Sequence, residues 1–274
     1  MRIGFIGAGN MGGALIKGYS STLSNTQTSS ESDGIIVYDA DSDKIKALAL
    51  SPVVKGTDSI SDLYDESDVI VICVKPQIID IVLDELAQCS PDMGGKLIVS
   101  IAAGVSIGHM QSKLGDDAKI VRVMPNTPAM VGEGMSALSE GKAPLSESEH
   151  QALEKMFSSV GKTVWVAEDQ MDIVTGISGS SPAYAYMYIE GLINAGIEGG
   201  LSRETATILA AQSTLGAAKM VLESGTDPVQ LRINVCSPGG TTIEAVKVFE
   251  EEGFIETVEK AAKASATKSK SMSK

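Results

Sequence analysis

The first twelve residues constrain the fold most strongly. Arg2–Ile6 has the pattern of a short apolar strand, and a glycine-rich turn leads from it into a helical run over 11–19. In such a turn Gly7 permits the sharp bend, Gly9 lets backbone N–H groups approach a diphosphate, and Gly12 lets the helix pack against the strand. The helix N-terminus also attracts a diphosphate, because its first N–H groups are unpaired and partly positive. The segment predicts a dinucleotide site, with a structural glycine turn or a flavin site as alternatives.

The chain up to residue 166 alternates short β-branched runs with helical ones. The predicted strands are Arg2–Ile6, Ile35–Tyr38, Val69–Val74, Leu97–Ser100, Ile120–Met124, Met135–Ser139 and Val164–Val166. Several are continuous blocks of Val and Ile, as in strands buried on both faces. We therefore expect an α/β fold with an N-terminal Rossmann-type, doubly wound parallel sheet over residues 1–166. The Ser- and Thr-rich stretch 20–33 interrupts this rhythm and predicts a mobile loop to which we assign no function.

Strand patterns disappear after residue 169, where only helical patterns follow. Helices are predicted over 182–200, 203–222, from residue 227, and over 242–252, with Ser202 and Asp227 as N-caps. The first of them is apolar around most of its circumference and needs more cover than about 100 residues provide. We favour an all-helical dimerisation domain over 167–264; packing against the first domain alone is the alternative. The Ser- and Lys-rich tail, 265–274, is expected to be disordered.

Composition narrows the possible partners. The net charge of −13 argues against nucleic acid or an anionic membrane as partner, since both require a basic surface. The longest apolar run, Val69–Val74, is too short to span a bilayer. We recognise no signal peptide before the first strand, and the three cysteines show no C-x-x-C spacing, so we expect reduced thiols and a cytoplasmic protein. Two histidines are too few for a three-histidine metal site, and no metal is expected.

Two acidic residues follow the second predicted strand. An acid at the tip of this strand commonly binds the ribose hydroxyls of NAD and repels the 2′-phosphate of NADP. Asp39 is in this position and favours NADH, or the use of both dinucleotides. The alternative is that Asp39 or Asp41 caps the following helix.

Small residues and prolines follow several other strands. Val74–Pro76, Ala102–Gly104 and Met124–Pro128 lie where ligands bind in such folds, beyond the carboxyl ends of the strands. Each can also be an ordinary strand-ending turn.

Farther along the chain, Ser237–Thr242 opens a helix with two glycines and two threonine hydroxyls. The first N–H groups of that helix can receive a carboxylate, although the residues taken alone favour a simple capped helix start with a glycine turn. No catalytic base stands out. A reductase needs none when its substrate is a protonated imine, because the carbon is already electrophilic.

On these residues the sequence resembles the pyrroline-5-carboxylate reductase family. The motifs that carry the resemblance are Phe5–Gly9, Val74–Pro76, Ser100–Gly104, Met124–Pro128, Asp172–Gly179, Leu215–Lys219 and Ser237–Thr242. The resemblance implies a Rossmann domain and a helical dimerisation domain, with dimers that often assemble into rings such as homodecamers. It also implies hydride transfer from NADPH or NADH to the C=N carbon of 1-pyrroline-5-carboxylate, which yields L-proline in the last step of proline biosynthesis.

The resemblance also assigns roles to residues. Thr242 would hydrogen-bond the ring nitrogen, the N–H groups of Gly240 and Thr241 would hold the carboxylate, and Glu168 would lie near the substrate. Asn234 would lie near the cofactor, together with Gly7, Ala8, Gly9, Asn10, Met11, Gly12, Val74, Lys75, Pro76, Ala102, Ala103 and Gly104. Asp39 departs from the family pattern, because many relatives carry residues there that accept a phosphate.

Two other functions are possible for a chain with this architecture. A hydroxyacid dehydrogenase of similar architecture usually needs a lysine base on a central helix, and we find no such lysine context. A dinucleotide sensor or scaffold without catalysis would not need the Gly240–Thr242 segment. The sequence therefore favours the reductase.

Overall fold

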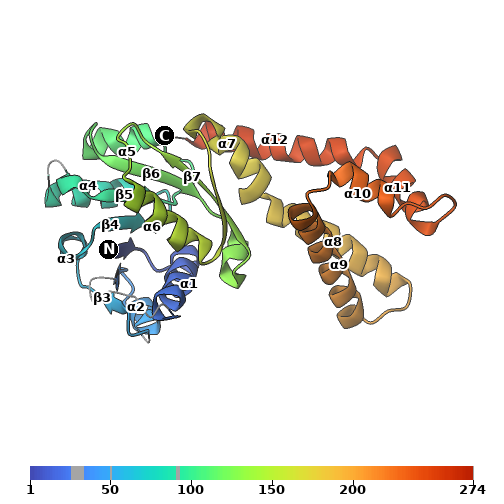
Figure 1. The fold of residues 1–274 in the computed structure, drawn as a ribbon, viewed down its shortest axis with the longest axis horizontal. Coiled ribbons are helices and arrows are strands. Elements are labelled where there is room, and N and C mark those ends of the chain that lie inside the picture. Colours follow the sequence, from blue (N-terminus) through green and yellow to red (C-terminus); the bar gives the residue numbers. More distant parts are fainter. Residues whose placement is uncertain (26–33, 50, 91–92, 274) are drawn as a thin grey trace. The chain divides into compact units, whose positions relative to one another are not determined.

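The computed structural model describes residues 1–25, 34–49, 51–90 and 93–273. The chain divides into two compact units, Met1–Gly179 together with Ser265–Lys274, and Ser180–Ala264 (Figure 1). This division differs from the expected boundary after residue 166, because the short helices that follow β8 pack with the sheet. The first unit is the α/β unit and the second is the helical unit.

Eight strands of the described chain form one sheet in the α/β unit. In spatial order they are β3 (Val54–Gly56), β2 (Gly34–Tyr38), β1 (Arg2–Ile6), β4 (Val69–Ile72), β5 (Leu97–Ser100), β6 (Lys119–Met124), β7 (Gly134–Glu140) and β8 (Gly161–Trp165). All neighbours are parallel except β6 and β7, which corrects the expectation of a wholly parallel sheet. The reason is the connection over 125–133, which is too short for a parallel crossover.

Helices cover both faces of this sheet. On one face lie α1 (Asn10–Asn25) and α6 (Glu147–Ser158); on the other lie α3 (Ile60–Glu66), α4 (Ile79–Cys89) and α5 (Ile107–Leu114). Alternate residues of β4 enter the two cores: Val69 and Val71 pack on the α1 side, and Ile70 and Ile72 on the α4 side. This double burial explains the continuous apolar strands and confirms the doubly wound fold.

Helix α1 is longer than the sequence suggests. Residues 20–25, expected in a loop, continue the helix, and residues 26–33 lie outside the described part of the chain. The hydroxyls of Ser20, Ser21, Thr22 and Ser24 donate to carbonyl oxygens three or four residues earlier. Their polarity is thus satisfied within the helix, although the same residues read as a loop in the sequence.

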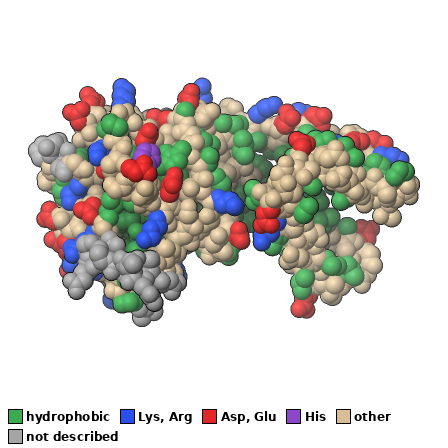
Figure 2. Space-filling model, in the orientation of Figure 1, with side chains coloured by type: hydrophobic (Ala, Val, Ile, Leu, Met, Phe, Trp, Pro, Cys, Tyr) green, Lys and Arg blue, Asp and Glu red, His purple; other side chains and the backbone are tan. Residues whose placement is uncertain are grey.

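The helical unit contains α8 (Ser181–Glu198), α9 (Arg203–Ser224), α10 (Pro228–Asn234), α11 (Thr241–Glu251) and the first part of α12 (Phe254–Met272). The predicted caps are confirmed: Ser202 accepts the N–H of Thr205, and Asp227 accepts that of Val229. Among the residues of this unit, all of which are described, only Ala206 and Ala210 are buried. Many large apolar side chains are exposed instead (Figure 2); the exposed fraction of Met187, for example, is 72%. A surface this apolar is typical of a protein interface.

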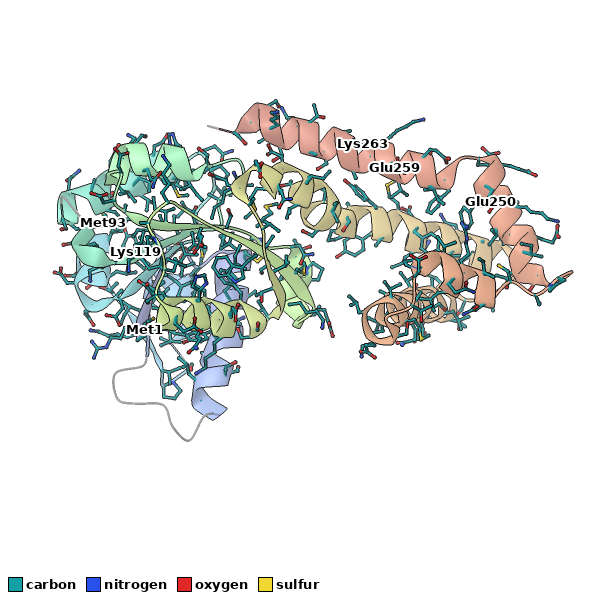
Figure 3. The ribbon with its side chains drawn as sticks, turned by 45° about the horizontal axis from the view of Figure 1, so that its top comes forward. Met1, Met93, Lys119, Glu250, Glu259 and Lys263 are labelled. Atoms are coloured by element: carbon teal, nitrogen blue, oxygen red, sulfur yellow. The ribbon has the colours of Figure 1, made fainter. Side chains whose placement is uncertain are left out.

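Helix α12 continues through the segment that we expected to be disordered. Residues 265–272 are helical, so that prediction is wrong. Phe254–Met272 holds no glycine or proline, and its Ala and Lys residues favour a helix. Glu259 and Lys263 pair along it at 3.1 Å (Figure 3).

Candidate active site

The glycine-rich turn lies at the switch point of the sheet, where β1 stands between β2 and β4. Gly7 has a φ of +103°, and its N–H donates to the Tyr38 carbonyl at 2.8 Å. A Cβ on Gly12 would press against the Gly7 carbonyl oxygen and lie 3.0 Å from the Cβ of Cys73. A Cβ on Gly9 would meet open space. Packing therefore requires glycine at positions 7 and 12, whereas Gly9 faces the room that a ligand would fill.

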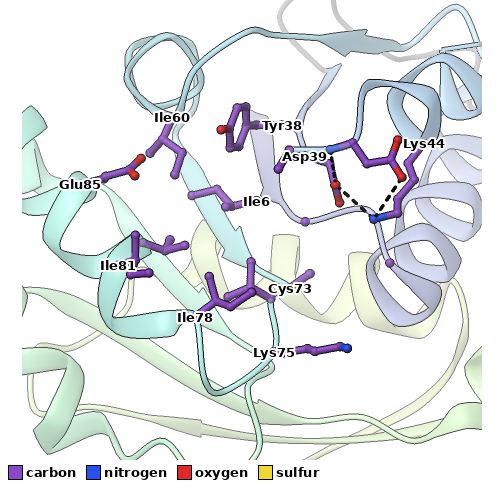
Figure 4. A pocket seen from close by; sticks show the side chains of 16 residues that line it. Ile6, Tyr38, Asp39, Lys44, Ile60, Cys73, Lys75, Ile78, Ile81 and Glu85 are labelled. Carbon is purple, nitrogen blue, oxygen red and sulfur yellow. Dashed lines mark hydrogen bonds and ion pairs between the residues drawn. The ribbon is translucent and has the colours of Figure 1, made fainter.

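A pocket of about 550 Å³ adjoins this turn (Figure 4). Its lining includes Gly7, Gly9, Asp39, Val74 and Lys75, all predicted cofactor residues. The opposite wall is mostly apolar and is formed by Tyr38, Ile60, Ile78, Ile81 and Val82. Such a wall suits a flat ring.

Sequence reasoning missed this apolar wall. Ile78 is 45% exposed and Ile81 is 59% exposed at the start of α4, so neither serves the core. Their spacing of three residues at the start of α4, directly after the predicted Val74–Pro76 segment, was the signal that could have marked them.

The two acidic residues after β2 have separate roles. Asp41 caps α2 (Ser42–Leu48) by accepting the N–H of Asp43. The Asp39 carboxylate instead accepts the N–H of Ala8 at 2.7 Å, the N–H of Asp41 at 2.9 Å and the ammonium of Lys44 at 3.2 Å. Burial alone would raise the pKa of Asp39, but these hydrogen bonds and the Lys44 charge hold that pKa below its usual value. Asp39 is thus ionised at neutral pH and tied to the glycine-rich turn.

Two further predicted segments begin at the same end of the sheet, where the parallel strands have their carboxyl ends. Val74–Pro76 follows β4 and Ala102–Gly104 follows β5, its parallel neighbour. The N–H of Ala102 donates to the Ser100 hydroxyl at 3.2 Å, and Gly104 has a φ of +73°. The α/β unit therefore brings the glycine-rich turn, Asp39 and both loops to one end of the sheet.

Glu168 has partners that the sequence did not reveal. Its carboxylate accepts the N–H of Ile107 at 2.6 Å and lies 3.6 Å from the guanidinium of Arg122, a buried residue of β6. It thus fixes the start of α5 just beyond the Ala102–Gly104 loop. The role of Glu168 toward a substrate stays a prediction.

The remaining predicted residues belong to the helical unit. Gly240 is the N-cap of α11, and Thr241 and Thr242 form its exposed first turn. The Gly240 N–H donates to the Ser237 carbonyl at 3.0 Å, so it is already engaged, which differs from the expectation that it is open to a carboxylate. Asn234 ends α10, and its side-chain oxygen accepts from Gln230.

Two absences hold for the described residues. Within them, no group of three or more His, Cys, Asp or Glu side chains is arranged to hold a metal ion. Nor does that part of the chain include a helix with the length and apolarity needed to cross a membrane.

Comparison with known proteins decides the family. Residues 168–272 match the pyrroline-5-carboxylate reductase dimerisation family, and residues 2–104 match a family described as NADP oxidoreductase, coenzyme F420-dependent. Pyrroline-5-carboxylate reductase from Escherichia coli is 41% identical over 100% of this chain and 98% of its own. The chain belongs to the pyrroline-5-carboxylate reductase family. It is therefore an oxidoreductase, as the resemblance implied.

Solved structures agree with this assignment. A pyrroline-5-carboxylate reductase from Coxiella burnetii matches with a TM-score of 0.91 and 35% identity, over 99% of this chain and 98% of its own. The Plasmodium falciparum enzyme with NADP bound matches with a TM-score of 0.84, also at 35% identity, over 100% of this chain and 98% of its own. The two-part fold, a Rossmann-type sheet and a helical dimerisation region, is thus confirmed.

Proposed function

We propose that this chain reduces 1-pyrroline-5-carboxylate to L-proline with NADH or NADPH. The observation that carries the proposal is the gathering of the glycine-rich turn, Asp39 and the two loops at one end of a sheet, in a member of this family. These residues fit a dinucleotide, because a Cβ on Gly9 would meet open space and the pocket beside it has an apolar wall. When bound, the reduced nicotinamide supplies the hydride.

The proposed cofactor contacts follow the order of the sheet. The N–H groups from Gly9 to Gly12, at the start of α1, hold the diphosphate, because a helix N-terminus favours an anion. Val74–Pro76 and Ala102–Gly104 hold the nicotinamide end, since they follow the next strands along the sheet. Asn234 is a further proposed cofactor residue.

The proposed substrate contacts are at the start of α11. The N–H of Thr241 holds the carboxylate, and for Gly240 the same role requires its N–H to leave Ser237. The Thr242 hydroxyl hydrogen-bonds the ring nitrogen and keeps it protonated as the hydride adds to the neighbouring carbon. Glu168 lies near the substrate in this proposal. No general base is needed, because a protonated imine carbon is already electrophilic.

Asp39 supports use of NADH at least as readily as NADPH. Its ionised carboxylate repels a 2′-phosphate, whereas ribose hydroxyls can donate to it. Lys44, 3.2 Å from that carboxylate, supplies a positive charge that offsets part of the repulsion, which favours use of both dinucleotides.

We further propose the assembly and the location of the protein. The exposed apolar helices of the helical unit support a homodimer, and rings of dimers, such as a homodecamer, are proposed from the family resemblance. The three free cysteines support a reducing, cytoplasmic location. We propose no nucleic-acid or membrane partner, given the net charge of −13.

The test is the oxidation of NADH and of NADPH, followed by absorbance, with and without 1-pyrroline-5-carboxylate. Oxidation that depends on this substrate, with proline as product, supports the proposal, and the ratio of the two rates measures the influence of Asp39. Dinucleotide binding without turnover would refute the reaction and turn attention to other imine or keto acids.

A further inference from the structure

The end of helix α12 returns to the α/β unit and lies on a proposed cofactor loop. Residues 265–274 cluster with the sheet, and the C-terminal end lies beside α5 and α7 (Met171–Val174) (Figure 1). Met272 lies beside Gly104: a Cβ added to Gly104 would lie 3.4 Å from the Met272 carbonyl oxygen and 3.6 Å from the Met272 Cβ. The last turn of α12 thus covers the Ala102–Gly104 loop from outside the sheet.

Ser269 anchors this turn. Its hydroxyl donates to the Asp172 carboxylate at 2.7 Å, and the two residues are 97 positions apart in the sequence. At 9% exposure it is the most buried residue of α12, all of which is described. Ser271, two positions on, is exposed, and its hydroxyl bonds to the carbonyl of Lys268 in the same helix. Ser269 therefore forms a hydrogen bond to a residue outside α12, whereas Ser271 bonds only within the helix.

The covered loop is also held on two other sides. The Ser100 hydroxyl accepts the N–H of Ala102 at the loop's start, and Glu168 accepts the N–H of Ile107 beyond its end. Between these points Gly104 adopts a positive φ, which glycine reaches as readily as a negative one, so the residue itself does not fix the loop in this conformation. The contact with Met272 is the one that a movement of the tail would remove.

We propose that Ser269 and Asp172 are positioning residues for the dinucleotide. Their hydrogen bond docks the end of α12 on Gly104 and keeps the loop in its binding conformation. The inference rests on the proposed cofactor role of Ala102–Gly104. Undocking lowers the fraction of binding-competent protein, so the apparent Kd and KM for the dinucleotide rise. Saturating dinucleotide restores the loop, so kcat stays close to that of the wild type. If the hydrogen bond had only a structural role, its loss would lower the stability of the protein but would not raise KM selectively while leaving kcat unchanged.

The test compares Ser269→Asp with Ser271→Asp in the full chain. The first substitution sets a second carboxylate against Asp172, whereas the second adds the same charge to an exposed position of the same turn. Adding Asp172→Asn to Ser269→Asp restores a hydrogen bond across the contact. Binding of NADH and of NADPH is measured by fluorescence titration. The values of kcat and KM are measured with 1-pyrroline-5-carboxylate as substrate, and the oligomeric state is measured by light scattering.

We expect Ser269→Asp to raise the dinucleotide Kd and KM by about tenfold, since one charge-assisted hydrogen bond is lost. Ser271→Asp should bind as the wild type does, and the double variant should recover most of the loss. By linkage, dinucleotide should also protect the wild-type tail from trypsin at Lys268 and Lys270. Equal binding by both aspartate variants, or a double variant as weak as Ser269→Asp, would overturn the inference.

The reaction itself can fail independently. A wild-type protein that binds dinucleotide but does not reduce 1-pyrroline-5-carboxylate would refute the proposed reaction, and the binding comparison would still decide the role of Ser269. A wild-type protein that binds neither dinucleotide would overturn both proposals.

Discussion

Replacing Gly12 by alanine tests whether the glycine-rich turn is shaped by close packing. The new Cβ would press on the Gly7 carbonyl oxygen and lie 3.0 Å from the Cβ of Cys73. Overpacking of this kind costs about 1–3 kcal/mol, and the better helix propensity of alanine offsets about 1 kcal/mol of it. We therefore expect a small loss of stability, about 0–2 kcal/mol. Dinucleotide binding should weaken by about five- to hundredfold if the bound turn retains the full misfit.

Gly13 offers a matched control one residue along the same helix. A Cβ there would lie 3.6 Å from the Ala8 carbonyl oxygen, an ordinary contact. Gly13→Ala should raise the free energy of unfolding by about 0.5–1 kcal/mol and leave dinucleotide binding unchanged. Urea denaturation and NADH fluorescence titration of both variants measure these effects. If Gly12→Ala binds NADH as tightly as Gly13→Ala, packing at this turn does not shape the site.

Four other predictions follow from the structure. Thr242→Ala should lower kcat by about ten- to hundredfold while the dinucleotide Kd hardly changes; near-normal turnover would remove Thr242 from the mechanism. Asp39→Asn should shift the NADPH-to-NADH ratio of kcat/KM toward NADPH by about tenfold, because the repelling charge is removed; an unchanged ratio would show that Asp39 does not sense the phosphate. Glu149, at 12% exposure, accepts from Ser146 and Lys119; burial raises its pKa, but these bonds lower it more, to below its usual value. Its contribution is thus present above the unfolded pKa and is lost as pH falls through the folded one. Glu149→Gln should therefore cost about 1–2 kcal/mol in urea denaturation at pH 7, and progressively less as pH falls below the unfolded pKa. A cost that does not change with pH would contradict this. Met187→Asp should shift light-scattering mass from dimer toward monomer, and an unchanged mass would place the interface elsewhere.

The sequence predicted those elements of the fold whose signal is local. Continuous Val and Ile blocks marked β4 and β5, and capping residues marked the starts of α9 and α10. It missed β3, which is only three residues long and contains a lysine, Lys55. It also predicted β7 parallel to β6, since strand patterns carry no direction. The tail was predicted to be disordered because its Ser and Lys content was given more weight than its lack of glycine and proline. The bond from Ser269 to Asp172 joins residues 97 positions apart, so no local pattern reveals it.

The sequence predicted where the candidate site lies in the sheet, but not all of the residues that form it. Glycines and the segments that follow strands identified the end of the sheet where the pocket lies, because the carboxyl ends of parallel strands meet there. The sequence left open whether Asp39 or Asp41 caps α2; Asp41 does, and the Asp39 carboxylate contacts Ala8. The sequence analysis did not single out Ile78 or Ile81, because an apolar pair at the start of a helix can equally belong to the core. The structure shows that both line the pocket.

The return of α12 to the α/β unit also sets an order of events during protein synthesis. A ribosome makes residues 1–179 first, then the whole helical unit, and only then residues 265–272, which complete the first unit. The sheet and its covering helices can form while translation continues, but the contact of Met272 with Gly104 must wait for the final helix. A chain whose translation stops after residue 264 would keep every strand, yet would lack the covering turn over the loop that follows β5.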